Sequence, residues 1–365
     1  MRKGRGIVIV SFLLLSGSMA ACQAKWKGTI VKEGEVTVIR NPKEPIYKTP
    51  ILDLKEEISI GGPDAQGEYA IGQIRDVVVD EAGIIYALDW QNTRVQVFDQ
   101  AGAFVRTIGR KGQGPGELEL PLTMSLVRNS GELAVHQATG RFSFFKTDGT
   151  FVRNFIFRGL SAVRGVCDSK GLIYLTEIRP GDDGARYVIK KVTGDGTVMA
   201  TLAEAPTGGG KKFDPFLPLL WFQIDRNDNF VYGYPEIYEI RIFGANSKLS
   251  RRIVRDYDPV AVTAAERAEQ EKIFEGRGPL DFKKYHTAYR WFFLSDLGHI
   301  FVATFEKAAD GKIIHDIFDP EGRFIGRIPL RRMGVGIFKG KFYAREEDED
   351  GFPLIKRYAA TWKVK

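Results

Sequence analysis

The sequence predicts an all-β protein, a six-bladed β-propeller of four-stranded antiparallel blades. Three observations lead to this fold class. Short runs rich in Val, Ile, Phe and Tyr, separated by glycine-centred turns, recur in six copies along the 365-residue chain. The clearest copy, residues 74–108, reads as four strands joined by three turns. The last copy lacks a fourth run, while an additional run at residues 52–60 precedes the first copy.

Each copy is marked by a tight turn between its first and second runs. The residues at this turn are Gly83, Gly131, Gly171, Asn229, Gly298 and Gly340. A second turn, between the third and fourth runs, recurs at Gly102, Gly149, Gly196, Asn246 and Gly322. Glycine and asparagine adopt the positive φ angle of a tight hairpin at a lower cost than other residues. Six turns of the first kind therefore indicate six blades.

The strand missing from the sixth copy is predicted to come from the N-terminal side. A glycine-rich stretch follows both Ile60 and Ile108, and fifteen residues further on lie Arg75 and Thr123 respectively. Because Ile108 ends the outer strand of the first blade, residues 52–60 correspond to an outer strand as well. We expect this segment to complete the sixth blade, which removes open sheet edges that would otherwise invite aggregation.

Residues 1–21 have the layout of a secretory signal peptide. Basic residues precede an apolar run at residues 7–15, which is too short for a permanent membrane-spanning helix. The following Ser18-Met-Ala-Ala-Cys22 resembles a bacterial lipobox, in which Cys22 is acylated after cleavage. The alternative is ordinary secretion with cleavage nearby. Both interpretations predict export; the first predicts a cell-envelope lipoprotein, at the periplasmic face or outer membrane, held by the lipid on Cys22.

The remaining chain is long enough for one large β domain. Residues 22–51 are expected to be a tether and N-terminal extension, and residues 52–363 the propeller. Losing the three basic residues of the signal peptide lowers the formal net charge from +7 to +4, which does not indicate a nucleic-acid partner. Cys167 is left without a disulfide partner and is expected to be a buried structural thiol. We expect a monomer.

Residues 86–98 and 108–117 resemble the repeats of NHL-repeat proteins. More narrowly, together with residues 34–42, they resemble bacterial six-bladed β-propeller lipoproteins. The resemblance implies the fold and the export, and it implies no particular activity. Asp89, Asn92 and Arg94 also match the NHL pattern, in which such polar residues fix the loop between the second and third strands.

Loop lengths distinguish the two faces of the predicted ring. The turns between strands one and two and between strands three and four are short, and they share one face. The longer connections share the other face, and the largest of them spans residues 258–285. It contains the capping box Thr263-Ala-Ala-Glu266, which predicts a short helix extending to Phe274. Long loops on a rigid scaffold favour a binding function for this face.

Candidate ligand-binding residues follow from aligning the six innermost strands. The residues that begin these strands are Arg75, Thr123, Val163, Trp221, Arg290 and Arg332. Three guanidinium groups and an indole at one mouth of the channel suit a small anion or an acidic sugar. At the loops after the second strands, Glu177 and His136 are further candidates. A one-residue error in the alignment would move any of these side chains into the packed interior or onto a loop.

No sequence motif indicates catalysis. The glycine-rich Lys111–Gly116 segment lacks the ending of a phosphate-binding loop, and no Gly-x-Ser-x-Gly, His-Glu-x-x-His or Cys-x-x-Cys motif occurs. We therefore expect a non-enzymatic binding module for a small anion, a glycan or a protein, with no cofactor. The alternative is a lactonase-like hydrolase or a lyase with a metal on the channel axis. Ca²⁺ would be the metal in that case, and Asp76 the best candidate ligand.

Overall fold

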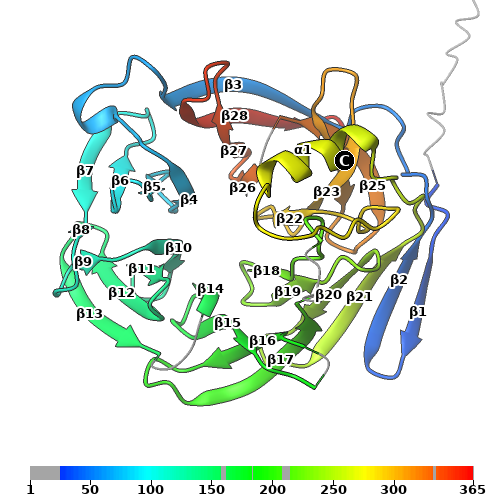
Figure 1. The fold of residues 1–365 in the computed structure, drawn as a ribbon, viewed down its shortest axis with the longest axis horizontal. Coiled ribbons are helices and arrows are strands. Elements are labelled where there is room, and N and C mark those ends of the chain that lie inside the picture. The colour runs from blue at the N-terminus through cyan, green and yellow to red at the C-terminus, as the bar shows by residue number, and fades with distance from the viewer. Residues whose placement is uncertain (1–24, 158–161, 183, 208–213, 332–333, 365) are drawn as a thin grey trace, which may run out of the picture.

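The computed structural model describes residues 25–364 with the exception of residues 158–161, 183, 208–213 and 332–333. Six β-sheets are arranged as a ring around a central axis, and the chain passes from one sheet to the next around the ring (Figure 1). Each sheet contains one blade of four neighbouring antiparallel strands, the first of which is innermost. The predicted fold class is confirmed.

The first three blades follow the chain without interruption. Blade 1 consists of β4 (Ile74–Val79), β5 (Ile85–Asp89), β6 (Arg94–Phe98) and β7 (Phe104–Ile108). Two short strands that pair with each other then follow, β8 (Arg110–Lys111) and β9 (Glu117–Leu118). Blade 2 consists of β10 (Pro121–Val127), β11 (Glu132–Gln137), β12 (Arg141–Lys146) and β13 (Phe151–Ile156). Blade 3 consists of β14 (Ala162–Cys167), β15 (Ile173–Arg179), β16 (Arg186–Val192) and β17 (Val198–Pro206).

Strands from the N-terminal part of the chain join two of the other three sheets. Blade 4 contains β18 (Trp221–Ile224), β19 (Phe230–Gly233), β20 (Glu239–Phe243) and β21 (Leu249–Arg255). Blade 5 contains β22 (Trp291–Leu294), β23 (Ile300–Lys307), β24 (Ile313–Phe318) and β25 (Phe324–Leu330). Blade 6 contains β26 (Gly334–Phe338), β27 (Lys341–Glu347), β28 (Pro353–Trp362) and β3 (Leu52–Gly61).

The ring closes as predicted, because β3 is the outer strand of blade 6. It pairs antiparallel with β28 along its length, from Leu354 opposite Gly61 to Trp362 opposite Leu52. Ile60 is 4% exposed and belongs to an apolar cluster that joins blade 6 to blade 1. The strand therefore stabilises both a sheet and the packing of that sheet against its neighbour.

Residues 29–41 form a β-hairpin in place of the expected tether. The hairpin consists of β1 (Thr29–Glu33) and β2 (Val36–Asn41), and β2 pairs parallel with β21 and so extends the sheet of blade 4 to six strands. Asn41 anchors it, since its side chain donates to the Gly322 carbonyl at 2.9 Å and accepts from the Phe324 amide at 2.8 Å. The parallel pairing joins two segments that are distant in the chain, so no local pattern in the sequence predicts it.

The predicted helix is α1 (Ala264–Ile273), which begins with the expected capping box between Thr263 and Glu266. It lies over blade 5 on the face of the longer loops (Figure 1). His286 holds it there, with Nε2 at 3.3 Å from the Glu266 carboxylate and its ring stacked on Phe305 at 4.1 Å. No helix in the part of the chain that the structure describes is long and apolar enough to cross a membrane.

The turn glycines have positive φ angles as expected, but the turns of blade 4 differ. There the residues with positive φ are Asp228 (59°) and Ser247 (63°), one position away from Asn229 and Asn246. An ordinary residue adopts this conformation only at a cost. Asp228 compensates with hydrogen bonds, because its carboxylate accepts from the amide and the hydroxyl of Ser169 in blade 3, at 2.9 and 2.6 Å. This turn therefore connects two blades as well as two strands.

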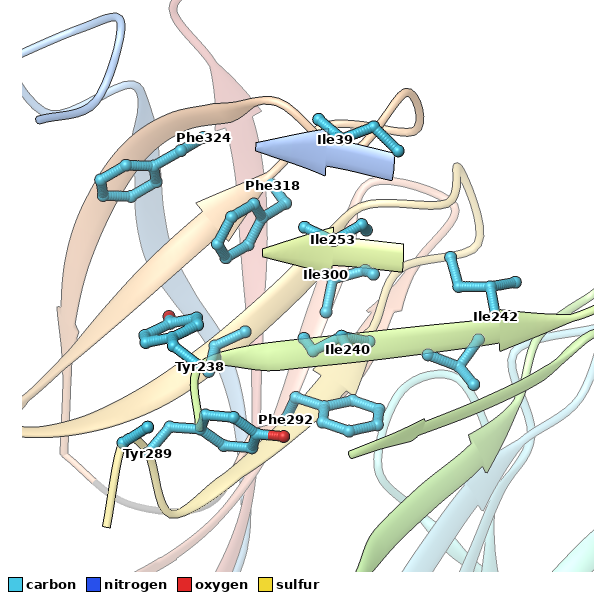
Figure 2. Close-up of a cluster of buried hydrophobic side chains, with 13 residues drawn as sticks. Ile39, Tyr238, Ile240, Ile242, Ile253, Tyr289, Phe292, Ile300, Phe318 and Phe324 are labelled. Atoms are coloured by element: carbon cyan, nitrogen blue, oxygen red, sulfur yellow. The ribbon is translucent and has the colours of Figure 1, made fainter. Parts of the chain in front are cut away.

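Apolar layers between neighbouring sheets form the core. Figure 2 shows the layer between blades 4 and 5, in which Ile240 and Ile253 of blade 4 face Phe292, Ile300 and Phe318 of blade 5. These side chains are at most 3% exposed. Because every blade is covered on both faces by its neighbours, the residues of one strand supply two different layers.

Two buried histidines lie within these layers. The His136 ring packs on Phe142 at 4.7 Å, and burial lowers its pKa to about 3. Burial also lowers the pKa of His315, to about 4. Both nitrogens of His136 lack a hydrogen-bond partner among the described residues. His136 is therefore a neutral packing group in the folded protein.

The ring closure can be tested with a charge in strand β3. Ile60→Asp should lower the free energy of unfolding by about 3 kcal/mol or more, because it buries a carboxylate in the layer between blades 6 and 1. Ser59→Asp places the same carboxylate on the exposed side of the strand and should cost less than about 1 kcal/mol. Urea unfolding followed by intrinsic fluorescence measures both. Equal losses for the two variants would contradict this role of β3.

Stability should also depend on pH through His136. Between pH 6.5 and about 3 this histidine is protonated in the unfolded chain and neutral in the folded protein. The contribution of His136 to the free energy of unfolding is therefore fully present above pH 6.5 and is lost as the pH falls. His136→Leu should reduce the slope of unfolding free energy against pH, between pH 6 and 4.5, by about 1.4 kcal/mol per pH unit. Denaturant titrations at several pH values measure this slope. An unchanged slope in the variant would show that His136 is not the group involved.

Candidate functional site

A cavity of about 1030 Å³ lies on the axis of the ring and is lined by the innermost strands of all six blades. About half of the side chains that line it are apolar. Representative members are Met124, Leu126, Val166, Ile224, Leu294 and Ile337. The charged residues gather at its two ends.

A β-bulge recurs at the mouth of this cavity, on the side of the longer loops. In four blades the pairing of the innermost strand with the second strand shifts by one residue near the start of the innermost strand. The extra residues are Arg75, Leu122, Val163 and Val335. A bulge re-aims the side chains that follow it. In blades 1, 2 and 3 these are Asp76, Thr123 and Arg164, and all three line the cavity.

Asp76 connects the innermost strands of blades 1 and 2. Its carboxylate accepts hydrogen bonds from the amides of Val77, at 2.9 Å, and of Met124 in blade 2, at 2.8 Å. Burial raises the pKa of Asp76, while the positive charges of Arg345 and Arg164 act in the opposite direction. The carboxylate thus ties two blades together and partly balances two guanidinium groups.

Arg164 lies against the wall that blade 4 presents to the cavity. Its guanidinium carbon is 4.4 Å from the ring centroid of Trp221 and 5.4 Å from that of Phe222. Its Nε is buried without a hydrogen-bond partner among the described residues. Burial lowers the pKa of Arg164, Asp76 raises it, and the nearby charges of Arg345 and Arg75 lower it. An arginine keeps its charge under such shifts, so this is a partly buried cation with an unused donor.

Arg345, from the second strand of blade 6, completes the charged cluster. Its guanidinium donates to the backbone carbonyl of Arg75 and lies 3.5 Å from that of Ile74. Burial is the main reason that its pKa is lowered, and the charge of Asp76 opposes this shift. Arg75 is exposed and also lines the cavity. The mouth cluster therefore consists of Arg75, Asp76, Arg164 and Arg345, whose formal charges are three positive and one negative.

Ion pairs cross the opposite end of the cavity, on the side of the short turns. Arg226 of blade 4 pairs with Glu81 of blade 1, on the other side of the ring, and lies 3.8 Å from Asp296 of blade 5. Lys339 of blade 6 is 3.3 Å from Glu81, and its amide donates to Asp296 at 2.8 Å. In addition, Arg128 of blade 2 donates to the Arg226 carbonyl at 2.8 Å. Charges are paired at this end, whereas the four described residues of the mouth cluster comprise three arginines and one carboxylate.

Four of the six residues predicted to begin the innermost strands line the cavity, namely Arg75, Thr123, Val163 and Trp221. Arg290 is not among the lining residues. Its Nε donates to the Thr304 carbonyl at 3.1 Å, and its guanidinium lies 4.3 Å from the Phe305 ring centroid. Arg332 lies outside the described residues, as does Cys22.

Glu177 and His136, the other two predicted ligand-binding residues, do not line the cavity either. The buried carboxylate of Glu177 is 2.7 Å from the Lys190 ammonium and also pairs with Arg179, so it fixes the loop of its own blade. Asp89 does the same in blade 1, where it accepts from Asn92 at 2.7 Å and from Arg94 at 3.3 Å. His136 is buried against Phe142.

Sequence reasoning missed Arg164 and Arg345. The signal for Arg164 was present, because it occupies the same position after the bulge in blade 3 as Asp76 does in blade 1. The alignment of strand starts selected the bulged residue instead, one position too early. Arg345, in the second strand of blade 6, was missed because the candidates from the second strands were Glu177 and His136, at the loops that follow these strands.

The donors at the mouth do not fit a metal ion. Both carboxylate oxygens of Asp76 accept backbone amides, and two guanidinium groups repel any cation placed beside them. Nowhere in the described ranges do three or more His, Cys, Asp or Glu side chains come together in a way that could hold a metal. The Ca²⁺ alternative therefore has no suitable ligand set at Asp76.

Comparisons with known proteins agree with the fold. The family described as a 6-bladed beta-propeller, DUF5128, matches residues 64–149. The chain is similar to the crystal structure of a putative exported protein from Bacteroides fragilis, with a TM-score of 0.61 and 12% identity, covering 90% of this chain and 100% of that chain. It is also similar to a member of the duf4221 family from Bacteroides vulgatus, with a TM-score of 0.54, 12% identity, and coverage of 85% and 99%. At these identities the likeness shows the fold alone.

Among curated proteins, a segment is similar to the Drosophila melanogaster protein brain tumor. The two are 33% identical over 121 residues, which is 31% of this chain and 12% of that protein. The chain thus spans only a small part of the length of this relative. Strand pairing, the family match and the two solved structures agree that the chain folds as a six-bladed β-propeller.

Proposed function

We propose that this protein is a non-enzymatic binding module that holds a small anion at the mouth of its central cavity. The observation that carries this proposal is the mouth cluster, in which three arginines and one carboxylate line the same cavity. Arg164 is central to it because its buried Nε has no hydrogen-bond partner among the described residues. A planar guanidinium fork matches a carboxylate or a phosphate with two parallel hydrogen bonds.

The electrostatics favour an anion over a neutral ligand. A buried charge is costly unless it is paired and hydrogen-bonded. Asp76 is the one carboxylate of the mouth cluster, and it already accepts two hydrogen bonds from backbone amides. Contact with Trp221 stabilises Arg164 by a cation–π interaction but provides no hydrogen-bond acceptor. An anion would supply both the missing charge and the missing acceptor.

We further propose that the protein acts outside the cytoplasm, anchored to the cell envelope through lipidated Cys22. The lipobox-like segment supports this placement, as do the resemblance to NHL-repeat lipoproteins and the similarity to a bacterial protein described as exported. A monomer with its lipid on Cys22, ahead of Trp26, would have its propeller close to the membrane surface. The partners that this proposal implies are the lipid bilayer and an anionic ligand.

Anion binding predicts a thermal shift that depends on Arg164. A ligand at one hundred times its Kd stabilises the folded state by about 2.7 kcal/mol, which should raise the melting temperature by about 4 °C. We expect this shift for at least one member of a panel of carboxylates, phosphates and acidic sugars. Arg164→Gln should abolish the shift, because it removes the charge and the fork while keeping a polar side chain.

Arg290→Gln is the matched control, since it removes a guanidinium that does not line the cavity. Its melting temperature without ligand can fall, but its shift with ligand should equal that of the wild type. If no anion stabilises the wild type, the mouth cluster has no binding role. The same conclusion holds if Arg164→Gln responds as the wild type does. A glycan or protein partner on the loop-rich face would then be the remaining candidate.

Anchoring through Cys22 makes a separate prediction. The protein expressed with residues 1–21 in a bacterial host should carry acyl chains and partition into the detergent phase of a Triton X-114 extraction. Cys22→Ser should move it to the aqueous phase or leave it unprocessed. Mass spectrometry of the mature N-terminus measures the acyl chains directly. A Cys22→Ser protein that is processed and membrane-bound as before would rule out the lipoprotein assignment.

A further inference from the structure

We infer that the ligand of the mouth cluster is an organic acid with an apolar body, bound with its carboxylate on Arg164 and its body against blades 3 and 4. This inference rests on the proposed function and names the class of anion. It depends on the size of the cavity, on the side chains that border Arg164, and on the difference between the two ends of the channel.

The cavity is larger than a bare inorganic anion needs, and apolar side chains form much of its wall. Its volume of about 1030 Å³ is at the upper end of the range, roughly 300–1,000 Å³, in which pockets bury an organic molecule of drug size. Below the mouth cluster, side chains such as Leu126, Val166 and Ile224 line the wall. A phosphate or acetate ion would use the guanidinium groups and leave this apolar surface in contact with water.

The surface beside Arg164 is apolar and accessible. Val163 and Leu219 both line the cavity, and they are 44% and 59% exposed. Trp221 also lines it, and the guanidinium group of Arg164 covers its ring at 4.4 Å. We call Val163, Leu219 and Trp221 the apolar rim. A ligand that covers the apolar rim removes hydrophobic surface from water, which an inorganic anion cannot do.

The position of the rim relative to the charge defines the ligand chemistry. The unpartnered Nε of Arg164 and the apolar rim belong to the same two strands, β14 and β18, or to the residues just before them. A carboxylate attached directly to an alkyl or aromatic body can contact both at once. The ion pairs among Glu81, Arg226 and Lys339 cross the far end, so the approach is from the loop-rich face.

A homologous series of linear carboxylates tests this inference. Acetate, butanoate and hexanoate carry the same head group and differ only in apolar length. By isothermal titration calorimetry at constant ionic strength, hexanoate should bind at least tenfold more tightly than acetate and than inorganic phosphate. Hexanamide, which has the same body without the charge, should bind at least tenfold more weakly than hexanoate.

Two variants separate the head group from the body. Leu219→Ser should remove most of the gain from acetate to hexanoate and leave acetate unchanged, because it alters only the apolar rim. Leu297→Ser is the matched control, since Leu297 is 64% exposed and does not line the cavity. It should bind the whole series as the wild type does. Arg164→Gln should weaken hexanoate by at least tenfold and leave hexanamide unchanged.

The outcomes distinguish this inference from the proposed function. If acetate, phosphate and hexanoate bind with equal affinity and all depend on Arg164, the proposed function holds and the apolar body is wrong. Hexanoate affinity that survives Arg164→Gln, or that Leu219→Ser does not reduce, would also overturn the inference. If no member of the series and no phosphate binds, the anion site itself is wrong.

Discussion

The structure depends on one constraint, the closure of the ring by an N-terminal strand. Each blade is covered on both faces by its neighbours, so the apolar layers are complete only when all of the blades are in place. Pairing of β3 with β28 joins the two ends of this arrangement and brings Ile60 against blade 1. The cavity exists for the same reason, because only a closed ring places six innermost strands around one axis.

At the centre of the closed ring, each innermost strand has one edge that pairs with no neighbouring strand. Side chains from the preceding blade accept hydrogen bonds from some of the backbone amides along this edge. Asp76 accepts from the Met124 amide at 2.8 Å, Ser125 from the Cys167 amide at 2.9 Å, and Gln223 from the Leu294 amide at 3.1 Å. These bonds place polar groups on the axis. The mouth cluster extends this arrangement, since Asp76 serves blade 2 and balances arginines at the same time.

The two faces of the ring thus differ in chemistry as well as in loop length. At the short-turn end, Glu81, Arg226, Asp296 and Lys339 neutralise one another across the channel. In the mouth cluster at the loop-rich end, three arginines stand against one carboxylate, and apolar side chains beside the cluster are exposed. The same face carries α1, which His286 fixes to blade 5. A rigid scaffold with paired charges at one end and an arginine-rich cluster at the other would give the proposed ligand a defined side of entry.

Local signals in the chain were enough to predict the number of blades, their order and the strand that closes the ring. These signals are turn residues with positive φ, runs of β-forming residues, and the equal spacing after Ile60 and Ile108. The capping box of α1 is local in the same way.

Which side chains meet on the axis depended instead on the folded ring. A bulge of one residue placed Arg164 beside Trp221 where the alignment had selected Val163, and contacts within blade 5 hold Arg290 on Phe305. The hairpin of β1 and β2 was equally hidden, because its partner β21 is distant in the chain. Since side chains alternate along a strand, the register at each bulge and the pairing of β2 with β21 decide what these residues touch, and the local sequence specifies neither.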